Sequence, residues 1–315
     1  MATKVKQGAA YTPKKRSLAQ TIKLDWSLYV FCLPGVILTF IFSYIPMYGV
    51  QIAFRNFNGK QGIWGSPWVG LRYFERFIKS PFFGQTISNT LILSLYGLLV
   101  SFPIPIILAL MLNSFRHKRY RKVIQMVTYA PNFISTVVMC GMLILFMSPT
   151  VGVINSVIKG LGGEAINFMG KKEYWRHIYV WSGVWQGMGW SSVIYFAALS
   201  GISPELHEAA MVDGATKFQI VRHIDFPSIL PTATILLIMD CGSVLSIGFE
   251  KAYNLQNSLN LSVSEIISTY VYKVGLLENN MSYSSAIGLF QTLVNLVLLV
   301  TVNKISDKLS GNSMF

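Results

Sequence analysis

The chain has 315 residues, of which 52% are hydrophobic and only 12% are charged, and its formal net charge is +13. A polypeptide of this composition cannot cover itself with a conventional polar surface, so the lipid bilayer is its expected solvent. The positive charge predicts membrane orientation rather than nucleic-acid binding, because the sequence contains no basic soluble domain to use it.

Six apolar runs approach or exceed the roughly 20 residues that a helix needs to cross a bilayer. In chain order they cover residues 28–50, 87–112, 123–147, 178–199, 227–249 and 286–302. The loops between them are too short for a separate soluble domain. The sequence therefore predicts an all-α membrane protein in which residues 28–302 form one six-helix domain between an N-terminal tail, 1–27, and a C-terminal tail, 303–315.

Lysine and arginine residues in the tails and loops predict how these helices are oriented. Six basic residues precede the first run, and five more crowd the loop after the second: Arg116, Lys118, Arg119, Arg121 and Lys122. No small-residue cleavage site follows the first run, so the tail is interpreted as uncleaved. Both termini are expected to be cytoplasmic in a multi-pass protein of the bacterial inner membrane.

The fourth run carries aromatic and polar side chains at helical spacing. Trp181 and Trp185 are one turn apart, and Gln186 and Trp190 have the same spacing. Aromatic faces and hydrogen-bonding groups converge in binding cavities. They also form belts at membrane interfaces or pack inside bundles, and both interpretations stay open.

The loop between the fourth and fifth runs is expected to be cytoplasmic and to form two short helices. Ser203 can cap the first helix, and Gly214 can end it in the left-handed conformation. Thr216 and Gln219 form a capping-box pattern for the second helix, which is predicted to end before Pro227 opens the fifth span.

Asp240 is an acid near the middle of the fifth run, where a charge costs at least ~2.5 kcal/mol unless it faces a partner or water. Ser243, Ser246 and Glu250 continue from it at helical spacing, which predicts a polar stripe along a water-filled cavity. A buried structural hydrogen bond, for example to Asn132 in the third run, explains the acid equally well. A proton-coupled secondary transporter would use the same carboxylate, although the chain has no convincing internal repeat of the kind that such transporters show.

The loop at residues 201–226 contains a spaced motif that runs on into the fifth span. Its members are Glu208, Ala209 and Ala210, then Gly214 after three residues, and after nine more Ile224, Phe226 and Pro227. This pattern resembles the EAA loop of binding-protein-dependent ABC importer permeases, with phenylalanine where leucine is usual. The resemblance implies a type I importer permease whose short helix, the coupling helix, docks on a separate nucleotide-binding subunit. An ordinary amphipathic interfacial helix is the alternative.

Three further segments, 185–190, 195–199 and 248–253, resemble the sugar-permease branch of that family, which has the maltose-permease fold. Importers of oligosaccharides and polysaccharides, such as alginate or pectin fragments, are the most similar subfamily. The resemblance implies a permease that translocates such a sugar after a solute-binding protein delivers it. The expected substrate path consists of Asn132, Trp185, Gln186, Trp190, Asp240, Ser243 and Glu250.

The resemblance also implies a heterodimer with a second permease, two ATPase subunits and an extracellular or periplasmic solute-binding protein. No cofactor is expected in this chain, because ATP and magnesium would be bound by the ATPase. The residues agree: Ala165 stands where a phosphate loop ending at Lys171 would need its first glycine, and the four histidines have no metal-ligand spacing. The chain is therefore predicted to be a transport subunit, not an enzyme.

Overall fold

The computed structural model describes residues 24–115 and 117–310, and within these ranges the chain is helical, with only two isolated β-bridges. Residues 1–23, Arg116 and 311–315, which include most of both predicted tails, lie outside the described residues. Contacts divide the chain into two compact units that meet between Gln51 and Ile52. The single six-helix domain expected over 28–302 stays a prediction.

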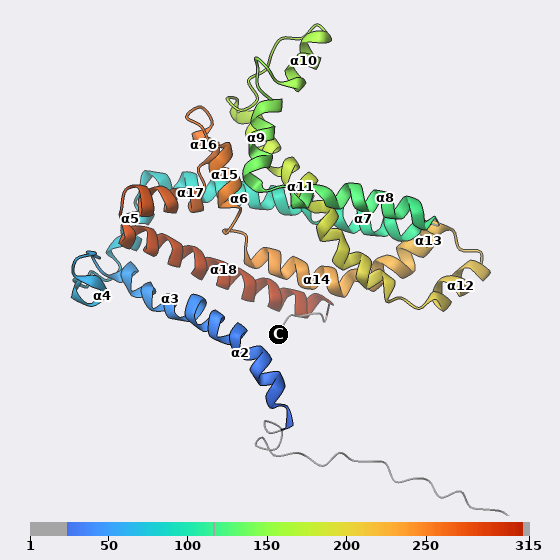
Figure 1. Cartoon of the computed structure of the whole chain (residues 1–315), viewed down its shortest axis with the longest axis horizontal. Helices are drawn as coiled ribbons and strands as arrows, with labels where there is room; N and C mark the ends of the chain where they lie inside the picture. Colours follow the sequence, from blue (N-terminus) through green and yellow to red (C-terminus); the bar gives the residue numbers. More distant parts are fainter. Residues whose placement is uncertain (1–23, 116, 311–315) are drawn as a thin grey trace, which may run out of the picture. The chain divides into compact units, whose positions relative to one another are not determined.

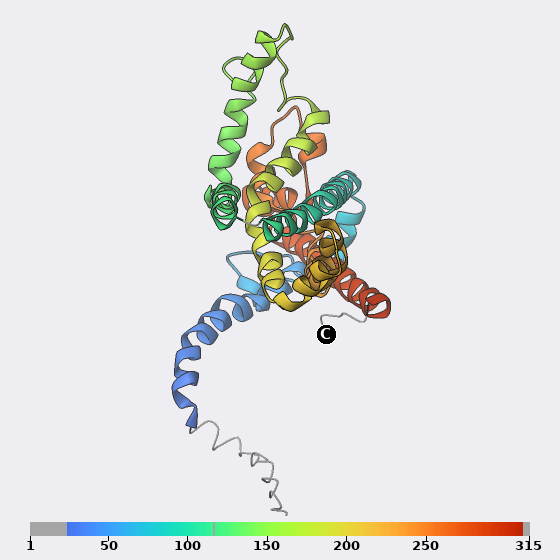
Figure 2. The same ribbon diagram turned by 90° about the vertical axis from the view of Figure 1, so that its right-hand side faces the viewer.

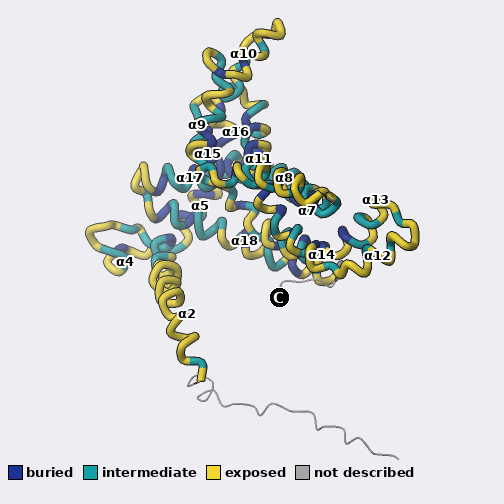
Figure 3. The backbone as a smooth tube through the Cα atoms, turned by 45° about the vertical axis from the view of Figure 1, so that its right-hand side comes forward, coloured by how far each residue is buried: buried dark blue, intermediate teal, exposed yellow. Residues whose placement is uncertain are grey.

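The first unit is built on one helical stretch that covers the first predicted span. It comprises α2 (Trp26–Thr39), the π-helical turn η1 (Phe40–Tyr44), α3 (Ile45–Met47) and the start of the 3₁₀ segment η2 (Tyr48–Phe54). No residue of α2, η1 or α3, all fully described, is buried, and Figure 3 shows α2 as exposed. A helix that is apolar on all sides and unburied within its own chain is suited to lipid or to another subunit.

Long helices also dominate the second unit (Figure 1). They are α6 (Pro81–Ser101), α7 (Pro103–Ser114), α11 (Lys172–Ser200), α14 (Phe226–Gly242) and α18 (Met281–Ser310). By length and composition, the described residues contain four stretches that could cross a membrane, or five if one bent pair counts as a span. α11 is more polar than these, but its 29 residues extend about 43 Å, longer than a bilayer core. The total of six spans stays a prediction.

The third predicted span is not one straight helix. It consists of α8 (Lys118–Tyr129), the 3₁₀ turn η3 (Ala130–Phe133) and α9 (Thr136–Phe146), and it bends by 97° between α8–η3 and α9. α9 turns away from α8 in both views of the chain (Figures 1 and 2). Pro131 lies in the turn, where a proline interrupts the helical hydrogen-bond ladder, and the Ser135 hydroxyl restarts the helix by accepting from Val138 N.

The fifth predicted span differs from expectation at both ends. The second short helix, α13 (Lys217–Ile220), does not stop before Pro227 but continues through the π-helical turn η4 (Val221–Asp225) into α14. A wider π turn accommodates a proline that cannot donate to the preceding turn. At the other end α14 stops at Gly242 instead of reaching residue 249.

Shorter helices complete the second unit. They are α4 (Gly62–Gly65), α5 (Arg72–Ile78), α10 (Val153–Gly160), α12 (Pro204–Val212), α15 (Phe249–Leu255), α16 (Leu261–Ser264), α17 (Ile267–Tyr272) and the π turn η5 (Lys273–Leu277). α18 runs eight residues past the predicted end of the sixth span, so the described part of the C-terminal tail is helical.

Three buried apolar clusters hold this unit together. One joins α5, α17 and α18 around Phe77 and Ile287. A second joins α6, α9, α11 and α15 around Leu93 and Trp175, and a third joins α7, α11 and α14 around Tyr195. Leu93 and Tyr195 also line one cavity, so this cavity lies between the second and third clusters.

Candidate functional site

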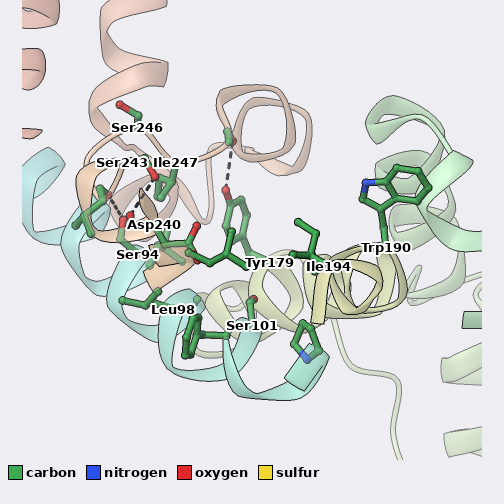
Figure 4. Close-up of a pocket in the computed structure, with 18 of the residues that line it drawn as sticks. Ser94, Leu98, Ser101, Tyr179, Trp190, Ile194, Asp240, Ser243, Ser246 and Ile247 are labelled. Atoms are coloured by element: carbon green, nitrogen blue, oxygen red, sulfur yellow. Dashed lines mark hydrogen bonds between the residues drawn. The ribbon is translucent and has the colours of Figure 1, made fainter. Parts of the chain in front are cut away.

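A cavity of about 720 Å³ opens between α6, α7, α11, α14 and the turn that follows α14 (Figure 4). Three of the predicted spans, 87–112, 178–199 and 227–249, contribute to its wall, and two of the apolar clusters support it on either side. Its size is in the range of cavities that bind small organic molecules.

The polar part of the cavity is formed where the fifth-span helix ends. Asp240 lies in the last turn of α14 with its side chain exposed to the cavity, and the Ser243 hydroxyl donates to the Asp240 carbonyl oxygen at 3.0 Å. Asp240 and Asn132, both described, form no hydrogen bond with each other, so Asn132 is not the structural partner of the acid. Asn132 lies in η3 and does not line the cavity.

The polar stripe predicted from Asp240 to Glu250 on one helix is also wrong, because the chain leaves the helix after Gly242. A Cβ at Gly242 would come within 2.6 Å of Leu299, so glycine allows α14 to approach α18 closely before the chain turns. Ser243 and Ser246 still face the same cavity from this turn. Glu250 is exposed in the first turn of α15 and lies outside it.

Hydrogen bonds from neighbouring helices hold the turn at residues 243–248. Asn295 of α18 accepts from Leu245 N at 3.0 Å and donates to the Ser246 hydroxyl at 2.8 Å. Gln291, one turn earlier, donates to the Leu245 carbonyl oxygen at 2.7 Å, and the Ser94 hydroxyl of α6 donates to the Val244 carbonyl oxygen. Irregular backbone is tolerated at membrane depth only when its polar groups are satisfied in this way or face water.

The aromatic part of the cavity comes mainly from α11. Tyr179 and Tyr195 line it together with Trp190, and the Tyr179 hydroxyl donates to the Gly248 carbonyl oxygen at 3.3 Å. Trp190 is about half exposed, and its ring meets the edge of Phe133 with centroids 6.1 Å apart. Rings whose faces remain open can stack on apolar faces of a ligand.

The structure separates the predicted path residues into two groups. Trp190, Asp240 and Ser243 line the cavity, whereas Trp185 and Gln186 do not. Gln186 instead donates to the Ile134 carbonyl oxygen at 2.8 Å, a bond that ties α11 to the segment between η3 and α9. The functional roles of all of them stay predictions.

Sequence reasoning missed the contribution of α6 and of the tyrosines. Ser94, Gly97 and Ser101 line the cavity from one face of α6. Their spacing of three and four residues in an otherwise apolar run was the available signal, since small and polar residues at such spacing share one helix face. Tyr179 and Tyr195 could not be distinguished from core aromatics.

The loop at residues 201–226 has the local structure expected from its caps. The Ser203 hydroxyl accepts from Glu205 N at the start of α12, and Thr216 and Gln219 form a complete capping box. Gly214 has φ of +78°, with its N–H bonded to the Met211 carbonyl and the next residue's N–H bonded to the Ala210 carbonyl, which is a Schellman motif. The predictions of the first short helix, of both caps and of a left-handed glycine are confirmed, whereas the second short helix is the start of the fifth-span helix.

The motif residues of this loop are accessible. No residue of the fully described helix α12 is buried, and Figure 3 shows the helix at the surface. Glu208, Ala209 and Gly214 are exposed, whereas Ala210 and Ile224 are half-buried. An exposed helix with small side chains allows close approach of another protein. Among the described residues no cluster of three or more histidine, cysteine or acidic side chains could hold a metal ion.

The chain is similar to known proteins over most of its length. The sequence pattern of the family described as "Binding-protein-dependent transport system inner membrane component" matches residues 101–311. Protein LplB of Bacillus subtilis is 40% identical, with 93% of this chain and 92% of that protein covered. The polygalacturonan/rhamnogalacturonan transport system permease protein YteP of the same organism is 39% identical over 96% of this chain and 94% of its own length.

Two solved structures have the same fold. A bacterial ABC transporter involved in the import of the acidic polysaccharide alginate contains a chain that is 38% identical, with a TM-score of 0.85 over 93% of this chain and 99% of that one. A bacterial alginate ABC transporter in complex with an alginate pentasaccharide-bound periplasmic protein contains a 37% identical chain, with a TM-score of 0.85 over 95% and 100% of the two chains.

Proposed function

The chain belongs to the family of binding-protein-dependent transport system inner membrane components, and we propose that it is the permease of an ATP-driven importer that takes up an oligosaccharide or polysaccharide. It is a multi-pass membrane subunit, and the hydrolysis of ATP belongs to a separate subunit. The observation that carries the proposal is the whole-chain similarity, at about the same length, to a permease that handles alginate.

The cavity chemistry supports a carbohydrate as the cargo. Sugars offer apolar ring faces that stack on aromatic side chains, and hydroxyl groups that exchange hydrogen bonds with polar side chains. Trp190, whose side chain is about half exposed, supplies the first kind of contact, and Asp240 and Ser243 supply the second. A second permease would contribute the facing wall, so the path is proposed to lie between two homologous subunits.

Transport is proposed to follow alternating access, with the solute-binding protein delivering the sugar at the outer face. The loop at residues 201–226 would dock on the ATPase through Glu208, Ala209, Ala210 and Gly214, while Ile224 and Pro227 connect it to the fifth-span helix. ATP and Mg²⁺ would be held by two ATPase subunits. Closure of those subunits would then displace the loop and change which side of the membrane the cavity faces. Both termini and this loop are proposed to lie in the cytoplasm, on the basis of the lysine and arginine residues around them.

The proton-coupled alternative explains Asp240 but is not favoured by the relatives, which are permeases of ABC transporters.

The decisive experiment reconstitutes the chain with its second permease, ATPases and binding protein in vesicles, and measures uptake of alginate-derived and pectin-derived oligosaccharides. We expect uptake that requires ATP and the binding protein and survives collapse of the proton gradient. Uptake driven by a proton gradient in vesicles that contain this chain alone would overturn the proposal.

A further inference from the structure

A hydrogen bond between a histidine and a buried carboxyl group joins the two halves of the loop at residues 201–226. His207 of α12 places Nε2 at 2.8 Å from Oδ1 of Asp225, the last residue of η4. The Asp225 side chain is only 3% exposed, and the His207 side chain is 27% exposed. The two residues are 18 positions apart in the sequence, so this contact closes the whole loop on itself.

The contact is the main attachment of α12 to the rest of the unit. No residue of this described helix is buried, and among the described residues its only side-chain hydrogen bond to another helix is the one from His207. The helix is otherwise connected by its caps and by the chain that enters and leaves it. A helix attached at so few points would swing about its ends without that bond.

Asp225 occupies a place where a charge needs a partner. It lies one turn before Ile229, a buried member of the apolar cluster shared by α7, α11 and α14. No other described cation lies within ion-pair distance of it, since Arg222 and His223 point outward and His223 bonds instead to the Gln219 carbonyl oxygen at 3.0 Å. A buried carboxylate left without its donor is strongly unfavourable, so the pair resists separation.

We propose that His207 and Asp225 are a positioning pair that clamps the coupling helix α12 to the base of the fifth-span helix. A displacement of α12 then reaches the base of α14 through the hydrogen bond as well as through the turn at Gly214, and α14 carries it to the cavity at its other end. Neither residue is one of the fixed positions of the EAA motif. This inference rests on the proposed function, because it assigns a role within the coupling loop.

Three variants distinguish the effect of losing the hydrogen bond between His207 and Asp225 from the effect of changing the size of the side chains. His207→Gln keeps an N–H donor at similar reach, His207→Phe keeps the ring but removes the donor, and the double variant His207→Phe/Asp225→Leu removes both the donor and the charge. The double variant leaves no unpaired charge, so it tests the pair even if His207→Phe fails to fold.

The first measurement reports on the position of α12 without any sugar. A spin label is attached to Val212→Cys, at the exposed end of α12, after Cys32, Cys140 and Cys241 are replaced by serine. In the reconstituted permease heterodimer we expect the His207→Phe and double variants to increase the mobile fraction of the label, and His207→Gln to restore the parental spectrum. Parental spectra in both donor-free variants would overturn the inference.

The second measurement is sugar imported per ATP hydrolysed by the full complex, with a pectin-derived or alginate-derived trisaccharide that the parental complex takes up. Loss of the donor should lower this ratio about tenfold while the ATPase stays bound, which is the effect of one hydrogen bond to a charged group. His207→Gln should lie near the parental ratio, and a parental ratio in the double variant would contradict the inference. If the parental complex imports neither sugar, the proposed function fails, while the label mobility still decides whether the pair positions α12.

Discussion

At the scale of single residues, a few side chains supply the charge and the indole ring of the cavity, and residues of the same kind nearby in the sequence lie outside it. Asp240 is the only acid that lines it, and Trp190 is its only tryptophan among the described residues. Glu250 and Trp185 have the same chemistry and lie nearby in the sequence, but the structure places them outside the cavity. These two pairs allow matched tests of the cavity's role.

Replacing Asp240 with asparagine should lower sugar uptake by the reconstituted complex about tenfold, because a hydrogen bond from a sugar hydroxyl to a charged acceptor is lost. The measurement is the initial rate of ATP-driven uptake, with assembly checked by co-purification of the partner subunits. Glu250→Gln is the control and should transport at the parental rate. If Asp240→Asn assembles and transports normally, Asp240 does not contact the sugar.

Replacing Trp190 with alanine should slow uptake about fivefold, since an aromatic face that stacks on a sugar ring contributes roughly 1 kcal/mol. Trp185→Ala removes the same area from the same helix outside the cavity and should have less than half of that effect on the rate. Equal losses in the two variants would indicate that α11 packing, not contact with the sugar, is what both tryptophans provide.

At the scale of elements, glycines set how helices end and approach one another. Gly214 ends α12 with φ of +78°, yet a Cβ there would meet no described atom within 4 Å. Gly189 of α11 has the opposite constraint, because a Cβ would lie 2.0 Å from the Thr128 carbonyl oxygen of α8, whereas a Cβ at Gly187 would have open space. Backbone strain and steric overlap can therefore be tested separately.

Gly214→Val should destabilise the turn after α12 by about 1–2 kcal/mol, the cost of a left-handed conformation for a residue with a side chain. The expected result is weaker retention of the ATPase in co-purification and slower ATP-driven uptake, with normal membrane insertion. Gly214→Asn serves as the control, since asparagine tolerates this conformation. Retention of the ATPase by the valine variant at the parental level would mean that the turn does not position the docking helix.

Gly189→Ala should cost about 1–3 kcal/mol in stability, because the added methyl group overlaps backbone atoms of α8 that cannot move aside freely. Thermal unfolding of the purified protein in detergent is the measurement, and a clear fall in Tm is expected. Gly187→Ala adds the same methyl group two residues away and should leave Tm unchanged or slightly raised. Similar falls in both variants would show that α11 does not approach α8 as closely as the structure indicates.

At the scale of the whole molecule, the described chain exposes far more apolar surface than a soluble protein does, in both of its units. Much of this surface belongs to the four candidate membrane spans, which lipid and a second permease would cover. They are residues 26–54, 81–114, 217–242 and 281–308. The loops between them divide into two sets, and the basic residues predict which set lies in the cytoplasm.

This orientation predicts a pattern of chemical labelling. After the native cysteines are replaced by serine, Leu161→Cys in the loop before α11 should react with a membrane-impermeant thiol reagent added from outside. Val212→Cys in the coupling loop should react only after the membrane is opened. Both positions are more than four-fifths exposed, so accessibility within the chain does not limit the reaction. The reverse pattern would invert the topology and place the coupling loop away from the ATPase.

Local features of the structure followed directly from the sequence. Apolar runs located the long helices, and residue-specific rules located the caps at Ser203 and Thr216 and the left-handed Gly214, because each depends on the backbone conformation of a few adjacent residues. The spaced EAA motif resembled that of binding-protein-dependent ABC importer permeases, and the family match over residues 101–311 confirms the family.

Tertiary packing decided the rest. Pro131, Gly242 and Pro227 mark where the third run bends by 97°, where α14 ends and where the π turn forms, but such residues only permit a break in a helix, and the packing of neighbouring helices decides whether it occurs. The same is true of the cavity, since only the packing of α6, α11 and α14 separates Asp240 and Trp190 from Glu250 and Trp185. The contact between His207 and Asp225 joins residues 18 positions apart, and no local rule of spacing could have paired them, because a loop fixes its long-range contacts only when the whole fold closes it.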